Sequence, residues 1–420
     1  MSALGPRRRK VAALGAAILS TGALAGCGGG SSTVNRIHGT QLTIFESVPL
    51  DGASQADGRA VLNGAQLALD QIGGRIGRYR IRIRLLDDAT ATTAGWNPGQ
   101  TEAGARLAAA DPTTIGYIGD LDSGASAVSI PLLNREGIAQ ISPTSTAVGL
   151  TSDAPGSSPG EPEKYYPTGA RTFARVIPND LVGAAAQVTL EQQLGCTRTL
   201  VVDDDEVDGV EFATTFAAAA MNAGLNVVGT QAYEPGAANY TSFAQSMASK
   251  TPDCILLSAL NPSSAVLVTE ALAAAMPRAQ IFTDGSLAES AYTDPALGGI
   301  PASLDPRVMM TMAALGARAY TPPGRAFLER YELRYGPPPP DAIFGYEAMS
   351  LMLDAISRAT GDGRQPALRS RVVAALFHTR NRQSVLGTYS IDSSGDTTLR
   401  EFGVWRLVAG RLSFWKAISS

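Results

Sequence analysis

The segment LDSGAS, residues 121–126, places an acid and two hydroxyl groups directly after IGYIG, an apolar run that is typical of a buried strand. Such a strand end fits a phosphate cradle, a nucleophile, or a grip on a small polar ligand. The next expected strand, IAQIS, ends in PTST, so Thr144, Ser145 and Thr146 supply a second set of hydroxyl and backbone groups.

Catalytic motifs do not accompany these hydroxyl groups. The chain has no GxSxG elbow, P-loop or GxGxxG next to its expected strands. Its two histidines, His38 and His378, lack the spacing of metal ligands, and the acidic run VDDDEVD lacks the spacing of a calcium loop. We therefore expect no enzyme, no metal site and no cofactor.

Ser123 precedes the apolar helical pattern AVSIPLLNREG and is well placed to cap that helix. The amides and the dipole of a free helix N-terminus also bind carboxylates. Because PTST brings further hydroxyl groups to the same sheet edge, a carboxylate-binding wall is favoured over a helix cap alone.

These segments need a sheet to position them, and the chain alternates β-rich runs with helical periods, as βαβ units do. The Pro/Gly/Ser-rich residues 151–169 divide this rhythm into two similar halves and are expected to form a surface loop or flap. The pattern predicts an α/β fold of two Rossmann-like lobes with parallel sheets. Ligands of such sheets lie at the carboxyl ends of the strands, so two facing edges across a hinge make a closable cleft. The expected strands are LTIFES, YRIRIRLLD, IGYIG and IAQIS in the first half, then TLVVD, LNVVGTQA, CILLSA, AQIFT and VMMTM.

The N-terminus reads as an export signal, because PRRRK is followed by an apolar stretch and then by Leu24-Ala25-Gly26-Cys27. These four residues resemble the bacterial lipobox, so residues 1–26 are expected to be a lipoprotein signal peptide with Cys27 as the lipidation site. Acyl chains on Cys27 would hold the protein on a membrane, with residues 27–39 as a flexible tether. An uncleaved anchor or a plain secretory signal is the alternative.

Composition favours an ordinary globular chain of two domains, at 17% charged and 45% hydrophobic residues. Removing residues 1–26 moves the formal charge from -4 to about -8. We therefore expect no nucleic-acid partner. No later apolar run has the ~20 residues of a transmembrane helix.

The order and spacing of several segments resemble those of the type I periplasmic solute-binding proteins of ABC transporters, specifically the leucine/isoleucine/valine-binding (branched-chain amino acid receptor) family. The resemblance covers essentially the whole mature chain and implies a periplasmic binding protein-like I fold with a three-crossing hinge. The segments are SVPLDGASQADGRAVLNGAQLALDQIGG, IGDLDSGAS, ISPTST, FARVIPND, GYEAMSLMLDAI and GTYSIDSSGD.

The resemblance also implies roles for individual residues. Ser123 corresponds to a serine that binds the ligand carboxylate, and Thr144, Ser145 and Thr146 correspond to groups that contact the ligand ammonium and carboxylate. Asp284, in TDG, corresponds to the acid that neutralises the ammonium. Such charge-assisted hydrogen bonds suit an α-amino acid.

Three acids depart from the family pattern. Asp208 in EVDG and Asp57 in QADG stand where the family often has aromatic residues, and Asp122 lies beside Ser123. If they rim the pocket, they predict a polar or cationic ligand in place of leucine, such as a basic amino acid, an amide or a polyamine-like solute. If they face solvent, this prediction does not hold.

The family's chain path places the hinge crossings near Arg175, Met309 and Leu386. Lobe 1 is then residues 40–175 and 309–386, and lobe 2 is residues 176–308 and 387–420. Cys196 and Cys254 each precede a strand of lobe 2, and these strands are expected to be neighbours, so a disulfide between them is feasible.

We expect, in sum, an extracytoplasmic, lipid-anchored monomer. It binds an amino acid or related small polar solute and delivers it to ABC permease subunits. A ligand-sensing receptor module for amides or amino acids that signals to a partner protein is one alternative. An enzyme that uses Asp120, Asp122 and Asp284 as converging acids is another.

Overall fold

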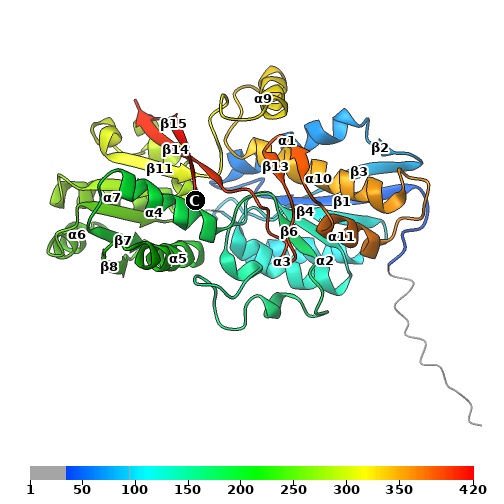
Figure 1. Cartoon of the computed structure of the whole chain (residues 1–420), viewed down its shortest axis with the longest axis horizontal. Coiled ribbons are helices and arrows are strands. Elements are labelled where there is room, and N and C mark those ends of the chain that lie inside the picture. Colours follow the sequence, from blue (N-terminus) through cyan, green and yellow to red (C-terminus); the bar gives the residue numbers. More distant parts are fainter. Residues whose placement is uncertain (1–34, 94) are drawn as a thin grey trace, which may run out of the picture.

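The computed structural model describes residues 35–93 and 95–420 and consists of two α/β lobes that lie side by side (Figure 1). The predicted signal peptide, Cys27 and most of the tether therefore lie outside the described residues. Among the described residues, no helix is long and apolar enough to cross a membrane.

The first lobe contains a six-stranded sheet in the order β2-β3-β1-β4-β5-β6. All its pairs are parallel except β2 with β3, as the βαβ rhythm predicted. The strands are β1 (Gln41–Val48), β2 (Arg75–Ile76), β3 (Tyr79–Asp87), β4 (Thr114–Ile118), β5 (Ala139–Ser142) and β6 (Phe173–Arg175).

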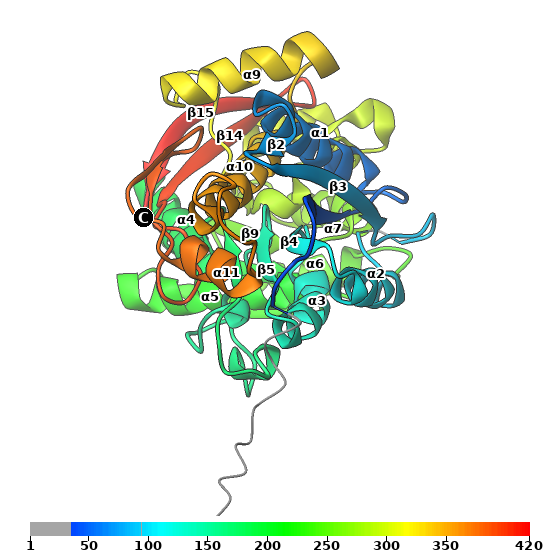
Figure 2. The ribbon, with the colours of Figure 1, turned by 90° about the vertical axis from the view of Figure 1, so that its right-hand side faces the viewer.

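The helices of the first lobe come from both ends of the chain, and Figure 2 shows the late helices α10 and α11 packed beside the early strands. Val61, Ala65 and Leu69 form the buried face of α1, as their spacing predicted, whereas Ile72 is 40% exposed because the helix ends before it. The helices are α1 (Gln55–Gln71), α2 (Pro98–Ala110), α3 (Ser123–Arg135), α9 (Pro322–Tyr335), α10 (Ala342–Thr360) and α11 (Arg369–Phe377).

The second lobe contains a seven-stranded sheet in the order β15-β14-β11-β10-β9-β7-β8. Its central strands are parallel, and the last two strands form an antiparallel hairpin at one edge, the predicted C-terminal hairpin. The strands are β7 (Thr199–Asp203), β8 (Val227–Ala232), β9 (Cys254–Ser258), β10 (Gln280–Thr283), β11 (Val308–Met312), β14 (Glu401–Val408) and β15 (Arg411–Ser419).

Helices cover this second sheet, and short 3-10 turns occupy several loops of the molecule. The helices are α4 (Asp180–Gln193), α5 (Val207–Ala223), α6 (Thr241–Ala248), α7 (Pro262–Ala275) and α8 (Ser290–Thr293). The 3-10 turns are η1 (Val148–Leu150), η2 (Glu163–Tyr165), η3 (Gly285–Leu287), η4 (Pro295–Leu297) and η5 (Ala302–Arg307).

Two lobe boundaries differ from those expected near Met309 and Leu386. Strand β11 pairs with β10 and β14, so the chain leaves the second lobe after Met312. The small hairpin of β12 (Arg382–Ser384) and β13 (Gly387–Tyr389) belongs to the first lobe, because the Tyr389 hydroxyl donates to Glu347 of α10 at 2.6 Å. The last crossing therefore follows Tyr389.

A buried arginine joins the first and last crossings. The Arg175 guanidinium donates to Asp396 Oδ1 at 2.7 Å, to the carbonyls of Ser145 and Ala147 at 3.0 and 2.8 Å, and to Thr151 Oγ1 at 2.6 Å. Arg175 is fully buried. Its ion pair with Asp396 thus fixes two of the crossing segments to the loop that follows β5.

Cys196 and Cys254 form a disulfide bond in the second lobe, with Cα atoms 5.8 Å apart. Cys254 begins β9 and Cys196 lies just before β7, and the two strands are parallel neighbours. The two strands are neighbours, as expected, and the disulfide bond that this made feasible is formed.

The Pro/Gly/Ser-rich flap, residues 151–169, is anchored to the first lobe instead of lying free. Tyr165 and Tyr166 are buried in a cluster with Ile130 and Phe173. The flap also reaches the second lobe, where Thr215 of α5 donates to the carbonyl of Pro155 at 3.3 Å.

Candidate functional site

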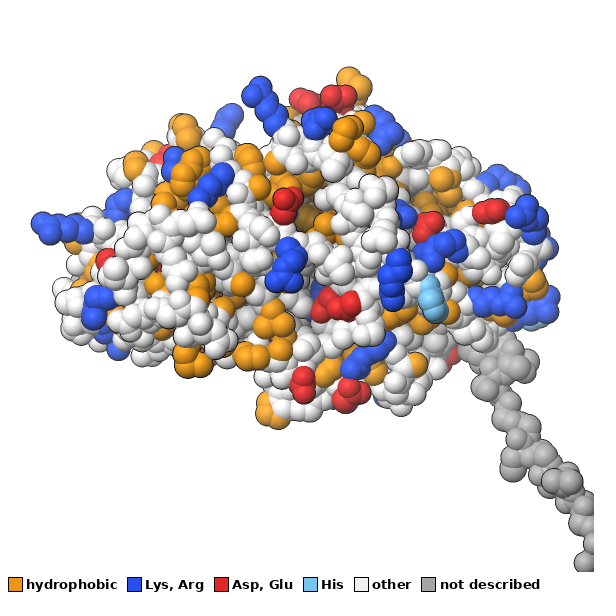
Figure 3. Space-filling model, viewed as in Figure 1, with side chains coloured by type: hydrophobic (Ala, Val, Ile, Leu, Met, Phe, Trp, Pro, Cys, Tyr) orange, Lys and Arg blue, Asp and Glu red, His pale blue; other side chains and the backbone are white. Residues whose placement is uncertain are grey.

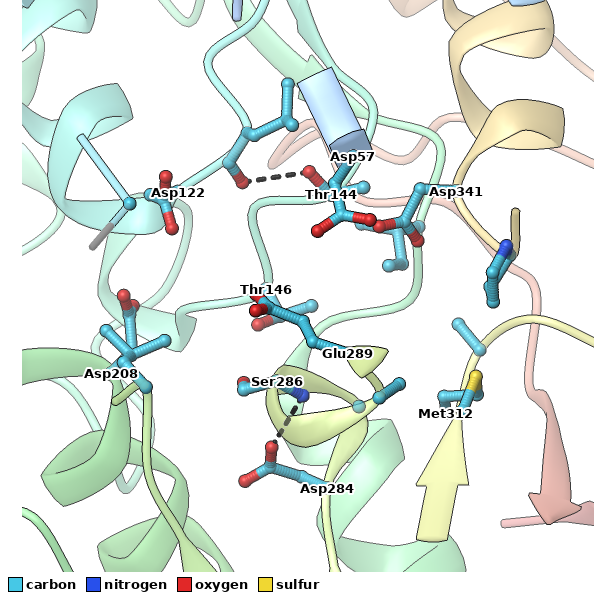
Figure 4. A pocket seen from close by; sticks show the side chains of 18 of the residues that line it. Asp57, Asp122, Thr144, Thr146, Asp208, Asp284, Ser286, Glu289, Met312 and Asp341 are labelled. Carbon is cyan, nitrogen blue, oxygen red and sulfur yellow. Dashed lines mark hydrogen bonds between the residues drawn. The ribbon is translucent and has the colours of Figure 1, made fainter. Parts of the chain in front are cut away.

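A cavity of about 410 Å³ lies between the two lobes and is lined by residues from both (Figure 4). Its walls consist of loops after the parallel strands and of the first turns of the helices that follow, the edge where open α/β sheets bind ligands. No residue of the flap at 151–169 is among the described lining residues.

Asp122 and Ser123 begin α3, but in roles that differ from the expected ones. Asp122 holds the N-cap position and Ser123 is the first helical residue, so the predicted cap lies one residue earlier. Ser123 is 5% exposed and is not a lining residue, whereas Asp122 lines the cavity.

The hydroxyl of Ser123 is engaged within the protein. The amides of Thr146 and Ala147 donate to Ser123 Oγ at 3.2 and 3.1 Å. A hydrogen bond from Ser123 also limits the rise in the pKa of Asp208, which burial brings to about 6. The Ser123 hydroxyl, which was expected to bind the ligand carboxylate, is therefore hydrogen-bonded to groups of the protein itself.

The residues of PTST divide in the same way. Thr144 and Thr146 line the cavity, while Ser145 is fully buried. Thr144 Oγ1 donates to the carbonyl of Leu121 at 2.9 Å, and Ser145 Oγ donates to the carbonyl of Asp120 at 3.1 Å. These bonds brace the two neighbouring strand ends of the first lobe.

Asp284 lies at the end of β10 on the opposite wall of the cavity (Figure 4). Its carboxylate accepts from Ser258 Oγ at 2.6 Å and from the amide of Ser286 at 2.8 Å. These two donors fix its orientation toward the space between the lobes. The position suits an acid that neutralises a ligand ammonium.

All three acids that depart from the family pattern line this one cavity. Asp57 comes from the first turn of α1, Asp122 from the cap of α3, and Asp208 from the first turn of α5. Figure 4 shows Asp57 beside the loop that carries Thr144, with Asp122 and Asp208 on another side of the cavity.

Four further acids of the lining were not among the predicted site residues: Asp180, Glu206, Glu289 and Asp341. Each lies at the start of a helix or directly before one, at α4, α5, α8 and α10. A helix-start acid is an ordinary favourable feature, so the sequence did not distinguish these four from solvent-facing acids.

Burial and mutual repulsion raise the pKa values of several lining acids. Burial brings the pKa of Asp122 to about 7, with repulsion by Asp208 as the next cause. Burial and the charge of Asp57 bring Asp341 to about 7, and burial with the same neighbour brings Glu289 to about 8. The cavity thus gathers acids whose ionisation is unfavourable until a positive charge enters the space between them.

No lysine, arginine or histidine is among the described residues that line the cavity. On the face of the molecule that Figure 3 shows, by contrast, basic side chains lie on both lobes. Within residues 35–93 and 95–420, no group of three or more His, Cys, Asp and Glu is arranged to hold a metal ion. The acids are distributed around the space and not gathered at one point.

An apolar surface completes the lining. Trp96, Phe212, Phe344 and Phe402 all contribute to it, together with Met312. The Trp96 ring packs closely against the first turn of α3, where a Cβ on Gly124 would lie 2.4 Å from it. A ligand with both charged groups and hydrocarbon surface would find complementary surface here.

Asp120 does not line the cavity, which separates it from Asp122 and Asp284. It is fully buried and accepts from the hydroxyl of Tyr117 at 2.9 Å. The converging set of acids expected for the enzymatic alternative is therefore not formed by these three residues.

Comparison with known proteins agrees with this architecture. A family model described as "Periplasmic binding protein" matches residues 47–411. The Leu/Ile/Val-binding protein BraC3 of Rhizobium johnstonii is 23% identical over 378 residues, which are 88% of this chain and 93% of the relative.

Solved structures give the same fold at low sequence identity. The leucine-binding protein LivK of Thermotoga maritima has a TM-score of 0.74 at 21% identity, over 90% of this chain and 99% of that one. The branched-chain amino acid binding protein LivJ of Streptococcus pneumoniae, solved with isoleucine, has 0.71 at 16% over 90% and 99%.

A solute-binding protein of an ABC transporter from R. palustris, solved with benzoate, is also similar. Its TM-score is 0.70 at 18% identity, over 90% of this chain and 96% of that one. The relatives are solute-binding proteins and not enzymes, and the family model spans most of the chain. The chain therefore belongs to the periplasmic binding protein family, as its resemblance to the leucine/isoleucine/valine-binding group indicated.

Proposed function

We propose that this protein is the extracytoplasmic substrate-binding lipoprotein of an ABC importer, and that it binds an amino acid or related small polar solute in the cleft between its lobes. The observation that carries the proposal is the cavity itself, whose acidic walls come from both lobes. Closure of the lobes around a solute changes the surface that a permease meets.

Solute binding is tested with the mature chain after its bound small molecules have been removed by unfolding and refolding. Incubation with the low-molecular-weight fraction of a cell extract is expected to raise Tm, because a ligand that binds only the folded state stabilises it. A Tm that stays unchanged with every fraction would contradict solute binding.

The lipid anchor is tested separately. Growth with a clickable fatty acid is expected to label the wild-type protein and to leave Cys27→Ser unlabelled. The matched control is Cys196→Ser, which removes a disulfide cysteine and should keep the label. Label on Cys27→Ser, or none on the wild type, would contradict the anchor.

A further inference from the structure

The acidic lining of the cleft narrows the chemical class of the ligand more than membership of the family does. Three carboxylates come from the first lobe and five from the second, and the described lining contains no cationic side chain. They are Asp57, Asp122 and Asp341 on one side, and Asp180, Glu206, Asp208, Asp284 and Glu289 on the other. In residues 35–93 and 95–420, none of these eight acids forms an ion pair.

Closure of the lobes brings these two acidic walls together. Their charges act across the cleft, since the neighbours that raise the pKa of Asp122 include Asp208 of the second lobe as well as Asp57 of the first. A neutral or zwitterionic ligand leaves this repulsion in place, because it adds no net positive charge. A ligand with two or more positive charges removes the repulsion and favours the closed form.

The hydroxyl groups expected to hold a ligand carboxylate already have partners within the protein. Ser123 Oγ receives the amides of Thr146 and Ala147, and the hydroxyl of Thr144 donates to the carbonyl of Leu121. Burial raises the pKa of Asp180 to about 7, and the charge of Arg175 and a hydrogen bond with Thr146 oppose this rise. A carboxylate in this position would face Asp122 and Asp208 with no unengaged donor among these groups.

The arrangement of the acids favours an extended organic cation over a metal ion. Asp57 and Asp341 lie together on one side of the cavity, and Asp122 and Asp208 lie on another (Figure 4). No metal-binding cluster exists among the described residues. The side chains of Phe344, Phe402 and Met312 contribute apolar surface to the same lining.

We propose that the cleft binds an aliphatic diamine or polyamine, an unbranched molecule with at least two ammonium groups, a hydrocarbon chain between them and no carboxylate. Ammonium groups form charge-assisted hydrogen bonds with the acids, and the methylene chain packs on the apolar lining. The inference rests on the proposed function, because it names the solute class of the same cleft.

The test is calorimetric titration of the refolded mature chain with 1,4-diaminobutane, spermidine, lysine, leucine and benzoate. We expect the two amines to bind at least tenfold more tightly than lysine, and leucine and benzoate to show no heat of binding. The double variant Asp57→Asn/Asp341→Asn should weaken the amines at least tenfold. Glu234→Gln, at an exposed acid away from the cavity, should bind them as the wild type does.

The outcomes separate this inference from the proposed function. Tighter binding of leucine, lysine or benzoate than of both amines would overturn the amine assignment and leave solute binding intact. No heat with any of the five probes would also overturn the assignment, while the cell-extract experiment decides solute binding independently. Equal loss of amine binding in Glu234→Gln and in the double variant would show a general charge effect and overturn the cleft as the site.

Discussion

Glu46 is an ionisable residue at a position in the hydrophobic interior, where a carboxylate is unfavourable. It lies in β1, is fully buried, and neither side-chain oxygen has a hydrogen-bond partner. Burial raises its pKa well above the usual range. A group with a raised pKa contributes stability below its unfolded pKa and loses it as pH rises, so Glu46 weakens the fold most at alkaline pH.

Replacing Glu46 with methionine, which has a similar shape, is expected to stabilise the protein by about 1–3 kcal/mol at pH 8 and by less at pH 5. The measurement is urea unfolding at both pH values. Glu347→Met is the control, because Glu347 accepts from Arg382 and Tyr389 and its loss should destabilise. Lower stability of Glu46→Met at pH 8 would contradict this account.

Arg175 shows how one side chain can hold the hinge. Arg175→Met leaves Asp396 and two backbone carbonyls without their buried cation, so we expect a loss of about 3–5 kcal/mol in the free energy of unfolding. The exposed Arg411→Met should change it by no more than about 0.5 kcal/mol. Similar effects of the two variants would show that the Arg175 network is not a strong structural element.

At the scale of elements, the contact between α1 and α10 depends on two glycines. A Cβ on Gly345 would lie 2.2 Å from the carbonyl of Val61, and one on Gly64 would lie 2.1 Å from that of Ala342. The backbones of the two helices therefore touch. This contact joins the N-terminal and C-terminal parts of the first lobe into one core.

Gly345→Ala is expected to destabilise the protein by about 1–3 kcal/mol, because the two helices must separate to admit the methyl group. Urea unfolding measures the change. Gly236→Ala is the matched control, since a Cβ there meets no atom within 4 Å. An unaltered Gly345→Ala protein would show that the helix contact is looser than described.

Most strands were predictable because their apolar runs are local. YRIRIRLLD and VMMTM coincide with β3 and β11, and the alternation in β3 matches its alternating burial over Tyr79–Ile83. The lobe to which β11 belongs was not predictable, because a strand buried on both faces fits either sheet. Its pairing with β14, a strand almost 100 residues later in the chain, places β11 in the second lobe.

The candidate site was predictable only where a motif marked it. Asp57, Asp122, Asp208 and Asp284 were found through the family pattern or departures from it. The hydroxyl of Ser123 was not predictable in its actual role, because its partners depend on the path of the loop after β5. The other four acids carry no motif, and only the folded lobes bring them together.

For the whole molecule, the acidic cleft predicts a pH dependence. Burial raises the pKa of Asp57 to about 6, of Asp341 to about 7 and of Glu289 to about 8. The stability from these groups is present below their usual pKa near 4 and is lost as pH rises through 6–8. The ligand-free protein should therefore lose Tm between pH 5 and pH 8.

The double variant Asp57→Asn/Asp341→Asn should lose less Tm than the wild type over this range, and thermal unfolding in the absence of ligand measures the difference. Added 1,4-diaminobutane should raise the wild-type Tm more at pH 8 than at pH 5, because more carboxylates are then ionised. An equal slope for the two proteins would show that the cleft acids do not carry the pH dependence.

We propose above that the interlobe cleft holds a small solute with more than one positive charge. Native mass spectrometry of the protein, purified from its own cells without dialysis, tests this most directly. The account predicts a single bound molecule whose elemental formula contains at least two amine nitrogens and no carboxyl group, and which is lost from Asp57→Asn/Asp341→Asn but kept by Glu234→Gln. A bound zwitterionic amino acid or benzoate-like anion would contradict it.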